Sequence, residues 1–294
     1  MILLKIHLTI QTNQPKPALA ASLFLGGVLH GSFEHLIRLH APEIAIELGM
    51  TQGSQLKYYS VLPPPYGWQP ETTPNTVFLD CGIILFSKAK QYLKPIISIL
   101  QHWHEIRLDG RIDKIKRCEI YVCGPGTQQQ LWCESNQNLI EDITLNFNHV
   151  FTASDNIKID LITSLILESD QQKAIGINTA PPDLLRIVRS LTRRIQKLEP
   201  QLAEELGINM PGWIEAEELI RHLPISSQGL KQVRWKYGSR TKKHPILRTG
   251  LIGQVQYAGY VPAPIIALLN WGCWFGIGQG TSLGQGMYST IMPE

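Results

Sequence analysis

The sequence predicts an α+β fold built as two similar halves. The chain has 294 residues, which is enough for two ordinary domains, and its 44% hydrophobic composition supports a buried core. In the first half, apolar segments with strand and helix periodicity follow the order strand, helix, strand, strand, helix, strand. The second half has a similar order. This is the order of the ferredoxin-like (βαββαβ, RRM-like) unit, so we expect two tandem domains, at residues 1–150 and 151–294.

The first half begins with a strand at residues 3–9 rather than with a signal peptide, because Lys5 and His7 interrupt the apolar run. A helix at residues 18–39 is indicated by the spacing of Leu25, Leu29 and Phe33. The other elements expected in this half are a helix at 42–48, strands at 56–62 and 77–86, an amphipathic helix at 88–101 and a strand at 116–123.

The clearest element of the second half is a helix at residues 183–198, DLLRIVRSLTRRIQKL, with apolar residues on one face and basic residues on the other. Residues 200–223 read as an inserted helical segment. The remaining elements expected here are strands at 157–167 and 172–177, a hairpin of strands at 228–237 and 247–257, a helix at 262–269 and a strand at 287–291.

Composition excludes several classes of protein. No apolar run reaches 18 residues, so a membrane-spanning helix is not expected. The five cysteines are odd in number and show no CxxC spacing, which favours reduced core thiols in a cytoplasmic protein over disulfides or a metal site. We therefore expect neither a cofactor nor a metal.

The charge is unevenly distributed along the chain. No acidic residue lies between Glu218 and Glu294, while this stretch contains eight lysines and arginines. Such a basic region suggests a polyanionic partner, above all a nucleic acid. A solvated basic face without a partner is the alternative. The eight residues are Arg221, Lys231, Arg234, Lys236, Arg240, Lys242, Lys243 and Arg248.

A glycine-rich segment, GIGQGTSLGQGMY, occupies residues 276–288. So many glycines do not suit the interior of a helix or a strand. They could bring backbone amides close to phosphates, let two backbones touch, or leave the segment flexible. A nucleotide-binding enzyme would place its glycines between a first strand and a helix. Here they follow an apolar helix and precede the last strand, which disfavours that class.

The stretch at residues 248–288, RTGLIGQVQYAGYVPAPIIALLNWGCWFGIGQGTSLGQGMY, resembles the end of the CRISPR-associated endoribonucleases that cut precursor crRNA. These proteins belong to the RAMP superfamily, whose tandem ferredoxin-like domains end in a glycine-rich loop. Gly276, Gly278, Gly284 and Gly286 stand at the fixed glycine positions of that loop. Gln279 departs from the pattern, since a lysine or arginine commonly follows the second glycine.

The resemblance implies a metal-independent cleavage in which the 2′-OH of the RNA attacks the adjacent phosphate and leaves a 2′,3′-cyclic phosphate. It also implies that the catalytic residues lie on the first helix and just after it. His30, in GVLH, is the expected general acid or base, with His35 as the substitute. Lys57 and Tyr58 are expected to stabilise charge and position the RNA. Gly49 occupies the position where many members carry a histidine.

The expected partner is CRISPR repeat RNA, which the protein is expected to keep bound as crRNA for a guided effector complex with other subunits. We expect the protein to be a monomer or a homodimer and to have no membrane partner. A non-catalytic RAMP subunit that only binds crRNA is the alternative, and Gly49 is the residue that favours it. The residues expected to bind RNA are Gly276, Gly278, Gln279, Gly284, Gly286, Arg186, Arg189, Arg193, Arg194, Arg234, Lys236, Arg240, Lys242 and Lys243.

Overall fold

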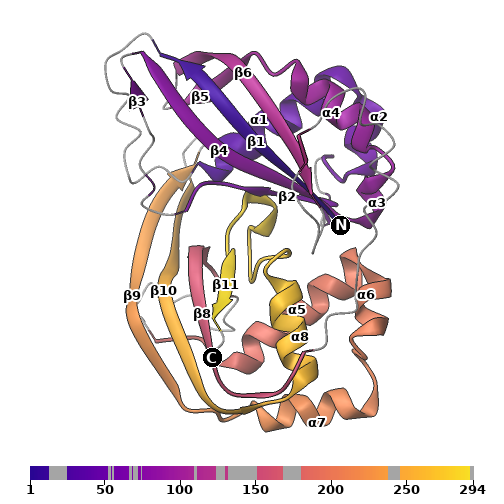
Figure 1. Cartoon of the computed structure of the whole chain (residues 1–294), viewed down its shortest axis with the longest axis vertical. Coiled ribbons are helices and arrows are strands. Elements are labelled where there is room, and N and C mark those ends of the chain that lie inside the picture. Colours follow the sequence, from indigo (N-terminus) through magenta and orange to yellow (C-terminus); the bar gives the residue numbers. More distant parts are fainter. Residues whose placement is uncertain are drawn as a thin grey trace. The chain divides into compact units, whose positions relative to one another are not determined.

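The computed structural model describes residues 1–12, 25–51, 54, 56–65, 68, 72–73, 75–108, 111–123, 130–131, 151–167, 180–237 and 246–291. The chain divides into two compact units, Met1–Asn148 and His149–Glu294. Each unit contains one antiparallel sheet with helices (Figure 1). The predicted α+β class with two ferredoxin-like units is therefore confirmed.

The sheet of the first unit is centred on β1 (Ile2–Gln11), which pairs antiparallel with β4 (Thr76–Leu85) on one side and β6 (Arg111–Cys123) on the other. β2 (Tyr59–Leu62) and β5 (Glu105–Leu108) extend the sheet, giving the order β2-β4-β1-β6-β5. Strands β2, β4, β1 and β6 are the four strands of the βαββαβ unit. Two short strands pair at its margins: β3 (Thr72–Thr73) with β4, and β7 (Gln130–Leu131) with β6.

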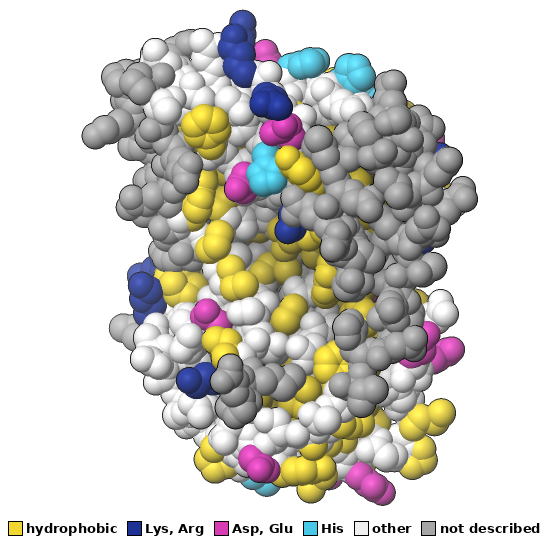
Figure 2. Space-filling model, viewed as in Figure 1, with side chains coloured by type: hydrophobic (Ala, Val, Ile, Leu, Met, Phe, Trp, Pro, Cys, Tyr) yellow, Lys and Arg dark blue, Asp and Glu magenta, His cyan; other side chains and the backbone are white. Residues whose placement is uncertain are grey.

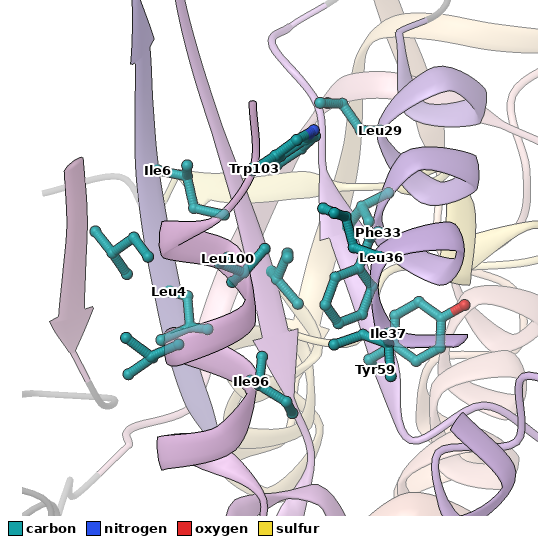
Figure 3. Close-up of a cluster of buried hydrophobic side chains, with 14 of the residues drawn as sticks. Leu4, Ile6, Leu29, Phe33, Leu36, Ile37, Tyr59, Ile96, Leu100 and Trp103 are labelled. Atoms are coloured by element: carbon teal, nitrogen blue, oxygen red, sulfur yellow. The ribbon is translucent and has the colours of Figure 1, made fainter. Parts of the chain in front are cut away.

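Helices α1 (Gly26–His40) and α4 (Leu93–Gln101) supply the core of the first unit, together with the short helices α2 (Pro42–Glu47) and α3 (Ser87–Lys90). Alternate residues of β1 point into this core because side chains of a strand alternate between its two faces. Figure 3 shows Leu4 and Ile6 of β1 among Phe33 and Ile37 of α1 and Ile96 and Leu100 of α4.

In this unit the structure departs from the prediction at one helix and one strand, and it describes one predicted helix only in part. The helix expected at 88–101 is two helices, α3 and α4, because Pro95 has no N–H to donate to the carbonyl of Gln91. The edge strand β5 was not predicted, since its charged residues weaken the apolar pattern. The helix expected at 18–39 is described from Gly26 onward, and its residues 18–24 lie outside the described residues.

The second unit repeats the arrangement with the sheet order β11-β8-β10-β9. α6 (Pro200–Glu205) and α7 (Pro211–Leu219) form the inserted helical segment. The strand expected at 172–177 lies outside the described residues. The main elements are β8 (Ser154–Leu165), α5 (Leu184–Leu198), β9 (Ile225–Tyr237), β10 (Ile246–Val261), α8 (Ala263–Gly272) and β11 (Tyr288–Ile291), with a 3₁₀ turn, η2, at Thr281–Leu283.

The expected free thiols are found at Cys81, Cys118, Cys123 and Cys273, while Cys133 lies outside the described residues. Among the helices that the structure describes, none combines the length and apolar character needed to cross a bilayer.

Candidate functional site

The candidate site of the first unit begins on one side of α1. His30, Glu34 and Arg38 follow one another at intervals of four residues, which places them on the same side of the helix. His35 and His40 fall on other sides and are exposed. The structure therefore brings His30, and not His35, together with other polar side chains.

Tyr59 and Lys57 approach the same side of α1 from the start of β2. The ring of Tyr59 is fully buried and packs edge-on against Phe33, with 5.1 Å between the ring centroids. Figure 3 shows this ring beside Phe33 and Ile37, with its hydroxyl directed away from the apolar side chains. Phe33 lies three residues after His30 on α1, so packing of the aromatic pair brings the Tyr59 hydroxyl to the imidazole.

The four side chains form one hydrogen-bonded cluster. The Tyr59 hydroxyl donates to Oε1 of Glu34 at 2.7 Å and lies 2.9 Å from Nε2 of His30. The Lys57 ammonium also donates to Oε1 of Glu34, and its Nζ is 3.5 Å from the Tyr59 oxygen. Nη2 of Arg38 donates to Oε2 of Glu34 at 3.0 Å and to the backbone carbonyl of Met50. We call His30, Glu34, Lys57 and Tyr59 the α1–β2 cluster.

Burial and charge set the protonation of this cluster. Burial lowers the pKa of His30 from 6.5 to about 4. The Glu34 carboxylate opposes this shift, while the positive charges of Lys57 and Arg38 add to it. Burial raises the pKa of Glu34, but His30, Lys57 and Tyr59 outweigh it and lower the pKa overall. Burial, followed by Glu34, raises the pKa of Tyr59. At neutral pH the cluster thus holds a neutral imidazole, a carboxylate and a neutral phenol beside the Lys57 ammonium.

Such a group has the parts needed for proton transfer. A neutral imidazole accepts a proton, and a lysine beside it stabilises negative charge that develops nearby. Sequence reasoning selected His30 and Lys57 but missed Glu34, whose spacing of four residues from His30 was the available signal. The predicted residue Tyr58 is not part of this cluster, whereas the adjacent Tyr59 is. The Tyr58 ring instead lies beneath Lys88, whose Nζ is 4.8 Å from the ring centroid.

Gly49 occupies a position that is closed to a histidine. Its φ is +75°, and a Cβ built on it would lie 2.1 Å from the backbone oxygen of Leu56. A side chain there would require both a left-handed backbone and a shift of the neighbouring chain. Local backbone packing therefore favours glycine at this position.

The glycine-rich segment of the second unit packs tightly on its own sheet and helix. The amide of Gly278 donates to Oγ of Ser190 at 3.0 Å, and that of Gly286 donates to the carbonyl of Ser164 at 2.9 Å. A Cβ on Gly278 would lie 2.0 Å from the oxygen of Ile166, and both glycines have positive φ. These glycines let two stretches of backbone touch, which is one of the three uses that the sequence allowed.

The backbone amides at the predicted RNA-binding positions of this segment are already hydrogen-bonded within the protein. Gly276 and Gly284 also donate their N–H groups to backbone carbonyls, those of Gly272 and Thr281. The amide of Gln279 donates to the carbonyl of Ile166, while its side chain is half-buried. Amides already paired inside the protein have no donor left for a phosphate. Any RNA contact of this segment would therefore be made by atoms other than these paired amides.

The arginines of α5 separate into different environments. Arg186, Arg189 and Arg193 are exposed, and Arg189 also forms an ion pair with Glu217 at 3.0 Å. Arg194 points inward, and its Nε donates to the backbone carbonyl of Phe275 at 2.8 Å. Burial lowers the pKa of Arg194 to about 10. Arg194 thus anchors the chain just before the glycine-rich segment.

The other predicted basic contacts lie on and beyond β9. Arg234 is exposed. The side chain of Lys236, and the residues Arg240, Lys242 and Lys243, lie outside what the structure describes. On the face drawn in Figure 2, the described lysines and arginines stand singly or in small groups among other side chains.

Comparison with known proteins agrees with the sequence resemblance. Residues 159–288 match the family model described as CRISPR-associated endoribonuclease Cas6. Among curated proteins, no match to this sequence is found. The family match covers most of the second unit and ends with the glycine-rich segment.

Solved structures match nearly the whole length of the chain. A Cas6 product complex from Thermus thermophilus has a TM-score of 0.58 at 15% identity and covers 98% of this chain and 100% of its own. A Cas6-related protein of Pyrococcus furiosus has a TM-score of 0.52 at 13% identity, covering 99% and 100%. A RAMP protein described as binding different RNA substrates has the same values. These likenesses establish the fold, and with the family match they confirm the predicted resemblance to the crRNA-processing RAMP proteins.

Proposed function

We propose that this chain is a CRISPR-associated endoribonuclease that cuts repeat RNA within precursor crRNA without a metal ion. The family match and the likeness to Cas6 structures support a role in crRNA processing. The observation that carries the proposal is the α1–β2 cluster, which holds His30 and Lys57 together on the first helix and at the strand that follows. These are the elements on which the resemblance predicts the catalytic residues.

In the proposed reaction, the 2′-OH beside the scissile phosphate is the nucleophile. Neutral His30 takes the proton of this hydroxyl as its oxygen bonds to phosphorus. The bond from phosphorus to the 5′-oxygen breaks, and the imidazolium returns the proton to that leaving oxygen. Lys57 stabilises the negative charge of the phosphorane. The products are a 2′,3′-cyclic phosphate and a 5′-hydroxyl.

The Tyr59 hydroxyl replaces that of Tyr58 in this proposal, because Tyr59 touches both His30 and Glu34. It holds the imidazole in place and does not itself react. The raised pKa of Tyr59 keeps its proton on the phenol at neutral pH.

The second unit is proposed to bind the RNA backbone. Exposed Arg186, Arg193 and Arg234 are suitable phosphate contacts, and Lys236, Arg240, Lys242 and Lys243 remain predicted ones. The cleaved crRNA would stay bound and pass to the other subunits of an effector complex. Arg194 points inward to the carbonyl of Phe275, so its role in this proposal is to stabilise the fold, whereas exposed Arg189 remains a predicted phosphate contact beside its ion pair with Glu217.

The test is incubation of the full chain with its repeat RNA in excess EDTA. The proposal expects one cut in the repeat, with a 2′,3′-cyclic phosphate that a phosphatase removes only after acid opening of the ring. Cleavage that requires added divalent metal would overturn the metal-independent mechanism. Tight binding without any cleavage would instead support the non-catalytic RAMP subunit.

A further inference from the structure

The α1–β2 cluster contains a hydrogen-bond chain whose direction can be worked out. Glu34 lies between two cationic side chains, Lys57 and Arg38, and is therefore a carboxylate. A carboxylate only accepts hydrogen bonds. The single proton of the Tyr59 hydroxyl, 2.7 Å from Oε1 of Glu34, is thus directed to that oxygen.

The direction of this bond determines the next one. With its O–H directed toward Glu34, the Tyr59 oxygen presents only lone pairs to Nε2 of His30, 2.9 Å away. If both atoms presented lone pairs they would repel, so Nε2 must carry a proton. A neutral imidazole has one N–H, which leaves Nδ1 with the lone pair.

Nδ1 of His30 is the ring nitrogen left to accept a proton. Within the residues that the structure describes, no hydrogen bond or ion pair involves this atom. The His30 side chain retains 12% of its exposure. The only basic atom of the imidazole is therefore the one that has no partner in the described chain.

We infer that Glu34 and Tyr59 are positioning residues that hold His30 as the Nε2–H tautomer, so that Nδ1 is the atom that exchanges the proton with RNA. This rests on the proposed function and adds the reacting atom to it. Proton uptake at Nδ1 places a positive charge on a ring whose Nε2 lies 3.6 Å from Oε1 of Glu34. The carboxylate stabilises this imidazolium, as an aspartate does behind the histidine of a serine-protease triad.

The tautomer can be measured without RNA by nitrogen-15 NMR of the full chain labelled at histidine, with the His30 signals assigned from their loss in His30→Gln. We expect the Nε2–H pattern in the wild type. Glu34→Leu removes the acceptor of the Tyr59 proton, which frees the hydroxyl to donate to Nε2 and shifts the population to Nδ1–H. Tyr59→Phe removes the acceptor of the Nε2 proton and gives a mixture. Glu47→Gln, which alters a surface ion pair with Lys88, is the matched control and should leave the His30 signals unchanged.

Kinetics complete the test. We expect Glu34→Leu to lower kcat by about 100-fold or more while KM stays within a few-fold, because general acid–base catalysis is lost and phosphate contacts remain. An Nδ1–H pattern in the wild type, or a tautomer that neither variant changes, would overturn the inference. If Glu34→Leu does not fold, Tyr59→Phe decides alone. Wild-type protein that shows the Nε2–H pattern but never cleaves RNA would sink the proposed function while the tautomer assignment stands.

Discussion

Nε2 of His30 lies 2.9 Å from the Tyr59 hydroxyl, although the two residues are 29 positions apart. A histidine in a helix is often hydrogen-bonded within its own helix. Here the hydrogen-bond partner of Nε2 comes from β2, because Phe33 packs its ring on that of Tyr59 and brings the hydroxyl to the preceding turn of α1. The contact joins the imidazole to Glu34 and Lys57, and the predictions for the first unit depend on it.

His30→Ala is expected to reduce single-turnover cleavage of repeat RNA by about 100-fold or more, since the proton acceptor is removed. RNA affinity, measured by filter binding, should change little. His35→Ala tests the substitute histidine, which is exposed and stands apart from the cluster. His40→Ala, at the end of the same helix, controls for effects on α1. If His35→Ala abolished cleavage and His30→Ala did not, the catalytic assignment would move to His35.

Phenylalanine substitutions separate the two adjacent tyrosines. Tyr59→Phe keeps the buried ring but deletes the hydroxyl that holds His30, so it should slow cleavage by about 10-fold or more. Tyr58→Phe deletes a hydroxyl outside the cluster and leaves the ring beneath Lys88 in place. Its cleavage rate should stay near that of the wild type. Equal losses in both variants would show that the cluster does not control the reaction.

Acid should destabilise the first unit through His30. Its pKa is about 4 in the folded chain and about 6.5 when unfolded, so the unfolded chain binds more protons between these values. The contribution of neutral His30 is therefore complete above about pH 6.5 and is lost as the pH falls toward 4. Glu34, Lys57, Arg38 and Tyr59 are the charged or titratable groups around it.

This sign can be checked by urea unfolding of wild type and His30→Gln at several pH values between about 4.5 and 7.5. Glutamine does not titrate, so the wild type should lose more of its free energy of unfolding on acidification than the variant. Parallel loss in the two proteins would mean that the folded and unfolded pKa values of His30 are similar.

Gly278→Ala should destabilise the second unit. The left-handed backbone alone costs an alanine about 1–2 kcal/mol, and the new Cβ would lie 2.0 Å from the oxygen of Ile166. Thermal unfolding and the yield of folded protein measure the effect. Gly212→Ala, on α7, is the matched control because a Cβ there meets nothing within 4 Å. Unchanged stability of Gly278→Ala would contradict the packing role of the glycine.

Adjacent arginines on α5 should behave differently. Arg193→Ala removes an exposed charge, so RNA affinity should fall and the slope of log K against log salt should shrink by about 0.7–1. Arg194→Ala removes the hydrogen bond to the carbonyl of Phe275 and should mainly lower the melting temperature. A stability loss in Arg193→Ala, with no change in the salt slope, would argue against its contact with phosphate.

Local patterns in the sequence were enough to predict most of the fold. The helix at 183–198 has a strong apolar face, and Asp183 caps it by accepting from the amide of Arg186 at 2.8 Å. Period-two and period-3.6 patterns report which side of an element is buried, and both units follow them. The division of the helix into α3 and α4 could also be inferred from Pro95. Strand β5, which contains charged residues, instead depends on its pairing with β6.

Only part of the candidate site could be predicted from the sequence, for the same reason. His30 and Lys57 are visible in the sequence as a helix histidine and a lysine before a strand. The choice between Tyr58 and Tyr59 depends on the register of β2, because adjacent residues of a strand point to opposite faces. No local pattern sets that register, which comes from pairing with β4.

The sequence by itself determined the two ferredoxin-like halves, the glycine-rich segment and the family they resemble, since these depend on periodicity and on residues close together in the chain. The tertiary structure alone decided that Glu34 and Tyr59 surround His30, that Gly49 has no room for a histidine, and that Arg194 faces inward. These relationships join residues far apart in the chain or depend on how a helix is rotated on its sheet. Packing of the core sets that rotation, and the spacing of residues along the sequence does not contain it.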